Sequence, residues 1–110
     1  MIVDRDGNIT IIAQEKASVK TLVNNIEQAY EAYKNYHLIV RLSSLDQISL
    51  NDVIEFLRLS NNHRAEKKSF VVVSDKANLD EMPDEILVVP TLQEAYDIIE
   101  MEDIERDLGF

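Results

Sequence analysis

The sequence predicts a single domain of the α/β class with a mixed, mostly parallel sheet, and three observations support this. Two β-rich apolar runs, 38–42 and 69–73, flank a helical pattern that begins at Ser49, the order of a crossover between parallel strands. Asp6-Gly7 separates two apolar runs near the start of the chain, as in an antiparallel hairpin. The 110 residues are 45% hydrophobic and 29% charged, a length and balance typical of one folded domain.

The first elements are expected to be a hairpin and a helix. The apolar runs 1–3 and 9–12 lie either side of Asp6-Gly7, where glycine accepts the positive φ that a tight turn demands. A helix with Ser18 as its N-cap should follow and end near Asn35. The apolar residues at helical spacing are Val19, Leu22, Val23, Ile26, Tyr30 and Tyr33. Tyr30, Tyr33 and Tyr36 are expected to pack at the margin of the core with hydrated hydroxyls.

The middle of the chain predicts a central strand, a helix and a second buried strand. Run 38–42 is apolar except for Arg41, and run 70–73 is uninterrupted, as in a strand covered on both faces. The helix between them should begin at Ser49, with Asp52 at its positive end. Its expected buried face is Leu50, Val53, Ile54 and Leu57, with Phe56 or Leu59 at the edges. Cations suited to the helix dipole, or to an anion site, follow at Arg58, His63, Arg64, Lys67 and Lys68.

The last third predicts one helical turn, a short strand and a final helix. Residues 79–82 have room for one turn before Pro83, and 85–89 read as a strand ended by Pro90. Thr91 and Glu94 have the spacing of a capping box. The expected buried face of the final helix is Leu92, Ala95, Tyr96, Ile98 and Ile99. The apolar spacing continues at Met101, Ile104 and Leu108 through an acidic helical tail at about 100–110. The predicted order over 1–110 is β-β-α-β-α-β-(short α)-β-α.

Negative charge is concentrated in the last third of the chain. The net charge is −10, and residues 75–110 hold twelve acids against only Lys76 and Arg106. Such a surface repels nucleic acid and anionic lipid, so neither is expected as a partner, and it favours basic proteins. A solvated face that keeps the protein soluble is the alternative interpretation. No apolar run approaches the length of a membrane span, and Asp4 follows the first three residues too early for a signal peptide. The sequence therefore predicts a cytoplasmic protein.

The order of elements and the stretch 42–57 resemble the STAS domain of bacterial anti-sigma factor antagonists. The stretch 88–95 is similar to that family's passage from the last strand to the last helix. In the family, the turn before the second helix carries Asp-Ser-Ser/Thr-Gly, and a Ser or Thr there is phosphorylated by a partner kinase. The matching positions here are Ser49, Leu50, Asn51 and Asp52. The phosphorylated hydroxyl is thus replaced, while the resemblance implies a STAS-like fold and a partner such as an anti-sigma factor or a kinase-like protein.

The residues do not supply the usual catalytic constellations. Catalytic metal centres need converging ligands, and the only histidines, His37 and His63, lack metal-ligand spacing; both are expected at the surface. Phosphate-cradling loops need glycines, but only Gly7 and Gly109 are present. No cysteine is present, which removes disulfides and thiol nucleophiles. Asp4 and Asp6 flank the predicted hairpin turn and are interpreted as residues that favour the turn. We therefore expect no enzyme, no cofactor and no metal site.

The first functional hypothesis is a non-enzymatic protein interaction module that docks through the turn and helix start at 43–52. The polar residues expected to contact the partner are Ser43, Ser44, Asp46, Ser49, Asn51 and Asp52. Ordinary turn and capping chemistry is the alternative reading of these residues. Ser43, Ser44 and Ser49 are also candidate phosphoacceptors, and Ser49 is the preferred one because its phosphate would sit at a positive helix end.

Two other hypotheses stay open. In one, the acidic tail binds a basic protein partner, through Glu100, Glu102, Asp103, Glu105 and Asp107. In the other, the chain is a small anion- or nucleotide-binding α/β protein that uses the positive end of the second helix. The sequence also leaves open a homodimer.

Overall fold

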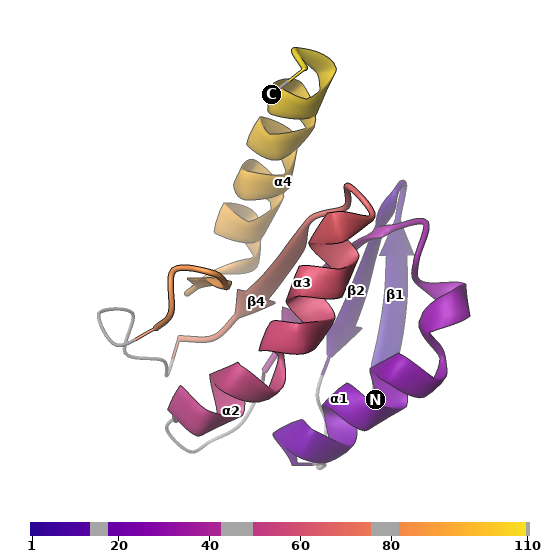
Figure 1. Ribbon diagram of the computed structural model, residues 1–110, viewed down its shortest axis with the longest axis vertical. Coiled ribbons are helices and arrows are strands. Elements are labelled where there is room, and N and C mark those ends of the chain that lie inside the picture. Colours follow the sequence, from indigo (N-terminus) through magenta and orange to yellow (C-terminus); the bar gives the residue numbers. More distant parts are fainter. Residues whose placement is uncertain (14–17, 43–49, 76–81, 110) are drawn as a thin grey trace.

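The computed structural model describes residues 1–13, 18–42, 50–75 and 82–109 (Figure 1). Within these ranges the strands form one sheet, whose spatial order β1-β2-β3-β4-β5 follows the chain. The strands are β1 (Ile2–Asp6), β2 (Ile9–Ala13), β3 (His37–Arg41), β4 (Phe70–Val73) and β5 (Leu87–Val89). β1 is antiparallel to β2, and β2 to β5 are mutually parallel. The predicted α/β class with a mixed, mostly parallel sheet is confirmed.

The chain begins with the predicted hairpin. Asp6 pairs with Ile9 across the turn, and Gly7 has a φ of +59°, a conformation that glycine adopts without steric cost. β1 lies at the edge of the sheet and all five of its residues are exposed. Three of these residues, Asp4, Arg5 and Asp6, carry charges, which discourage an edge strand from pairing with other chains.

The first helix is shorter than its periodicity suggested. α1 (Val19–Gln28) begins at Ser18, whose hydroxyl accepts a hydrogen bond from the backbone N–H of Thr21, so the predicted N-cap is confirmed. The helix ends at Gln28 rather than near Asn35, and a 3₁₀ turn, η1 (Tyr30–Ala32), follows. This turn places Tyr33 in the core and Tyr30 beside it.

The expected single helix after Ser49 is instead two, α2 (Leu50–Glu55) and α3 (Leu57–Ala65). At the junction the N–H of Phe56 bonds to the carbonyl of Val53, 3.0 Å away and only three residues earlier. The tighter turn directs the Phe56 ring into the core, where it lies 6.2 Å from the ring of Phe70.

This junction changes part of the predicted buried face, although Val53 is buried and Leu57 packs against the core as expected. Val53, Phe56 and Leu59 are buried, whereas Leu50 and Ile54, expected inside, are 41% and 46% exposed. The face that enters the core is therefore displaced from the stripe that the sequence suggested.

Two layers of helix cover the sheet, with α1, α2 and α3 on one face and α4 (Leu92–Asp107) on the other (Figure 1). Alternate residues of β4 serve the two layers: Phe70 and Val72 pack with α1 to α3, and Val71 and Val73 pack with α4. All four are buried, which confirms the expectation of a strand covered on both faces.

The last elements agree with the sequence in type and differ in length. β5 is limited to Leu87–Val89, although 85–89 was expected. Most of the helical turn expected at 79–82 lies outside the described residues. The hydroxyl of Thr91 accepts the N–H of Glu94 at 3.2 Å, confirming the N-cap of α4. α4 continues to Asp107, so the acidic tail is helical up to that residue. None of the helices in the described ranges combines the length and apolarity needed to cross a bilayer.

Candidate functional site

The predicted docking segment begins where β3 ends. β3 stops at Arg41, and the carboxyl ends of β2 to β5 share this edge because the strands are parallel. Open α/β sheets bind their ligands outside this edge. Ser43, Ser44, Asp46 and Ser49 lie outside the described residues. Asn51 and Asp52 lie in the first turn of α2, where Asn51 is exposed and Asp52 half-buried.

Beside Asn51 and Asp52, α2 presents an apolar pair to solvent. Leu50 and Ile54 are four residues apart, so they are neighbours on one side of the helix. Both are more than two-fifths exposed. A single exposed aliphatic side chain is ordinary on a protein surface. Two on adjacent turns, next to the predicted polar contact residues, form a small continuous patch.

A hollow adjoins this patch between α1 and the α2–α3 pair. Its volume is about 250 Å³, and it is lined by Val23, Asn24, Glu27, Ile54, Glu55 and Arg58. Arg58 Nη2 donates to both carboxylate oxygens of Glu27, at 2.9 and 2.8 Å. These two residues also line a neighbouring hollow of about 300 Å³, together with Tyr30, Leu59 and Asn62. The Arg58–Glu27 ion pair therefore joins α1 to α3 at the boundary of the two hollows.

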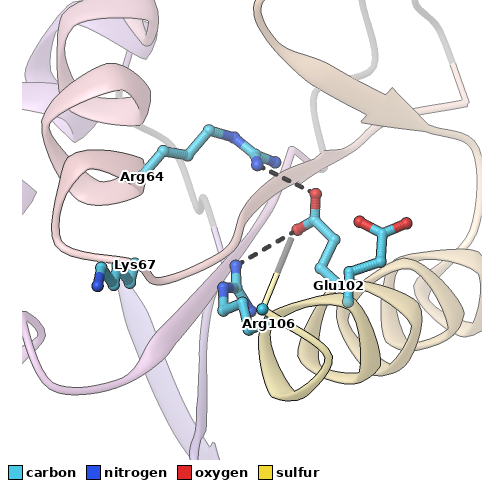
Figure 2. Close-up of a pocket in the computed structure, with 6 residues that line it drawn as sticks. Arg64, Lys67, Glu102 and Arg106 are labelled. Atoms are coloured by element: carbon cyan, nitrogen blue, oxygen red, sulfur yellow. Dashed lines mark hydrogen bonds and ion pairs between the residues drawn. The ribbon is translucent and has the colours of Figure 1, made fainter.

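A second polar region lies between the end of α3, the start of β4 and α4, near the amino ends of the central strands (Figure 2). Arg64 donates to one carboxylate oxygen of Glu102 at 3.1 Å, and the Ser69 hydroxyl donates to the other at 2.6 Å. Arg106 donates to the Ser69 hydroxyl at 2.8 Å and to Asp103 at 2.9 Å. A cavity of about 430 Å³ adjoins this network, lined by Arg64, Lys67, Glu102, Glu105, Arg106 and Gly109.

This network divides the acidic residues predicted as a partner face. Glu102 and Asp103 are half-buried and bonded to groups of their own chain, which fixes α4 to α3 and to the sheet. Glu100, Glu105 and Asp107 are exposed. Arg64 lies in the last turn of α3, as predicted, and its charge is also compensated by Glu102 across the interface with α4.

His37 was expected at the surface, but it is buried at the start of β3. Its Nδ1 accepts the N–H of Ser69 at 2.9 Å, so Nε2 carries the proton and donates to Asp103 at 3.0 Å. Burial lowers the pKa of His37 and outweighs the opposing effect of the Asp103 carboxylate. Both ring nitrogens are occupied, which leaves His37 no free lone pair to act as a base.

His63 is buried as well, on α3, so its predicted surface position is also wrong. The Tyr30 hydroxyl, expected to be hydrated, donates to His63 Nδ1 at 2.5 Å, and Nε2 donates to the carbonyl of Tyr36 at 2.7 Å. Burial lowers the pKa of His63 to about 4. The ring is therefore a neutral link between α3, η1 and the segment that enters β3.

Two of the groupings that catalysis often uses are a metal-ligand cluster and an exposed nucleophile. In the described ranges, no three His, Cys, Asp or Glu side chains are grouped closely enough to hold a metal ion. Ser69 is buried, and its hydroxyl donates to a carboxylate while accepting from Arg106, so it is not exposed to a substrate. The patch that sequence reasoning missed, Leu50 and Ile54, had a signal: Val53, Phe56 and His63 form a competing stripe at helical spacing.

Neither the models of known protein families nor the curated proteins match this sequence. The resemblance of 42–57 to a STAS domain accordingly stays a prediction, and the structure supports the broader α/β class.

Proposed function

We propose that the protein is a non-enzymatic interaction module, similar to an anti-sigma factor antagonist, that docks onto a protein partner through 43–52. The observation that carries this proposal is the exposure of Leu50 and Ile54 beside the polar residues of the first turn of α2. The resemblance implies that the partner is an anti-sigma factor or a kinase-like protein.

The shape and polarity of this surface favour a protein over a small molecule. Small-molecule sites are usually concave, with volumes of roughly 300–1,000 Å³. The hollow next to Ile54 is about 250 Å³ and is lined by three charged side chains, Glu27, Glu55 and Arg58. An apolar centre bordered by polar residues is the usual composition of a protein–protein interface. Leu50 and Ile54 would form that centre, and Asn51 and Asp52 part of its border.

The apolar pair supplies a measurable share of affinity. Folding buries only about half of the surface of Leu50 and Ile54. Covering the exposed half with a partner should therefore contribute about 1 kcal/mol to the free energy of binding for each side chain. Together they correspond to roughly a thirtyfold change in Kd. Replacing both by Glu should exceed this effect, because the interface would then have to desolvate two carboxylates.

The test is affinity purification of the tagged protein from its own cells, followed by mass spectrometry. Wild type is compared with the double variant Leu50→Glu/Ile54→Glu and with a matched control, Met101→Glu/Ile104→Glu. The control changes two apolar residues of α4, which are somewhat more exposed than the α2 pair and lie on the opposite side of the sheet. We expect a protein that wild type and control retain and the α2 variant loses, with all three melting alike. Equal recovery by both variants, or no specific partner, would contradict the proposal.

A further inference from the structure

The outer face of α4 carries an apolar stripe that no part of the described chain covers. Met101, Ile104 and Leu108 are 59%, 54% and 67% exposed. Their spacing of three and four residues places them on one side of the helix, or of its last turn. In Figure 1 the second half of α4, in yellow, extends beyond the strands of the sheet.

The opposite face of α4 is firmly attached to the rest of the molecule. Ala95 and Ile99 are buried against the sheet. One turn further on, Glu102 bonds to Arg64 at 3.1 Å and Asp103 bonds to His37 at 3.0 Å. At about 100° per residue, the apolar stripe points roughly opposite to these anchored residues. The helix therefore cannot rotate the stripe inward without breaking both its apolar and its ionic contacts.

Acidic side chains border the stripe on both sides. Glu100 and Glu105 are exposed and flank the stripe, one on each side, about 70° around the helix axis from its centre. Asp97 lies at its N-terminal end and Asp107 beyond Glu100, and both are also exposed. None of these four belongs to the network around Arg64 and Arg106 in Figure 2 that neutralises Glu102 and Asp103.

This charge pattern selects among the possible occupants. A second copy of the chain, packed stripe to stripe, would bring its own acidic border against this one, and like charges across an interface oppose association. An anionic lipid surface would be repelled for the same reason. A helix with an apolar stripe bordered by Lys or Arg complements the surface in both hydrophobicity and charge.

We infer that the outer face of α4 is a second docking surface, which binds a basic amphipathic helix of a protein partner. It lies across the sheet from α2, so a partner on either surface leaves the other accessible. The protein could in this way hold two partners together. This inference does not depend on the proposed docking at 43–52.

The probe is a synthetic peptide of about eighteen residues, built from Leu and Lys at helical spacing, with blocked ends and a fluorescent label. Binding to the full chain is followed by fluorescence anisotropy at low and at physiological salt. A peptide of the same composition but scrambled order measures non-specific attraction to an acidic protein. We expect the amphipathic peptide to bind at least tenfold more tightly than the scrambled one. Its affinity should fall several-fold as the salt concentration rises.

Variants then locate the site. Met101→Ser/Ile104→Ser should weaken binding of the amphipathic peptide at least tenfold. Glu100→Gln/Glu105→Gln should also weaken its binding and should reduce the dependence of the Kd on salt. Leu50→Glu/Ile54→Glu should leave the Kd unchanged, so this result is independent of the test at α2. Equal binding by wild type and the Ser variant would overturn the inference. A dimer at neutral pH that the Ser variant abolishes would also overturn it, because the stripe would then be covered by a second copy.

Discussion

We expect buried His63 to make the stability of the fold depend on pH. The neutral ring accepts from the Tyr30 hydroxyl and donates to the Tyr36 carbonyl. Protonation would add a donor at Nδ1, where an acceptor is now required, and would place a positive charge on a ring that is wholly buried. Burial therefore lowers the pKa of His63 from 6.5 to about 4.

The sign and size of the effect follow from this pKa. Between pH 6.5 and about 4 the unfolded chain binds a proton at this position that the folded chain does not bind. The contribution of neutral His63 to the free energy of unfolding is thus complete above pH 6.5, and it is lost progressively as the pH drops. At about 1.4 kcal/mol per pH unit, the loss from His63 is about 2 kcal/mol by pH 5 and about 3 kcal/mol by pH 4. His37, whose pKa is also lowered by burial, acts in the same direction.

The assay is urea unfolding followed by circular dichroism at several pH values from 7.5 to 5, above the range in which most carboxylates titrate. The control is His63→Gln, because an amide does not protonate but keeps one donor and one acceptor for Tyr36 and Tyr30. Between pH 7.5 and 5, the free energy of unfolding of wild type should fall by about 2 kcal/mol more than that of this variant. Equal losses in the two proteins would refute the reasoning.

Two further predictions concern the framework. Replacing Val72, wholly buried in β4, by Asp should cost about 3–5 kcal/mol, because the charge would have no partner; a cooperative melt within a few degrees of wild type would show that this strand is peripheral. Replacing Thr91 by Ala removes the acceptor of the Glu94 N–H and should cost about 1 kcal/mol in urea unfolding, whereas Thr91→Ser should cost little. Indistinguishable Ala and Ser variants would contradict the capping role.

Local chemistry explains which elements could be predicted. The hairpin depends on one residue that accepts positive φ, Gly7, and the start of α4 depends on one hydroxyl, that of Thr91. The central strands are runs of β-rich apolar residues, which have few alternatives once a sheet forms. Each of these signals is contained within a few residues of the element that it specifies.

The second helix could not be predicted correctly because two stripes compete in its sequence. Leu50, Ile54 and Leu57 have helical spacing, and so do Val53 and Phe56 with the residues that follow. The structure buries Val53 and Phe56 and leaves Leu50 and Ile54 exposed, because the Phe56 ring packs near Phe70, a residue of the adjoining strand. A contact with another element decides between patterns that are equally good locally.

The positions of the histidines also depend on distant residues. The partners of His63, Tyr30 and Tyr36, are 33 and 27 positions away, and Asp103 reaches His37 from the last helix. A histidine can be buried when both ring nitrogens find partners, and the sequence alone does not show that they do. For the candidate site, sequence reasoning proposed the start of α2 as a docking region. The apolar pair at its centre emerged only from the structure.

The most direct test of the docking function is the amount of partner recovered by Leu50→Glu/Ile54→Glu relative to Met101→Glu/Ile104→Glu. If the start of α2 is the interface, one protein should fall to about a tenth or less of its control level, while both variants keep the wild-type melting curve. If every protein that co-purifies with wild type is recovered equally by both variants, the docking surface is not at α2.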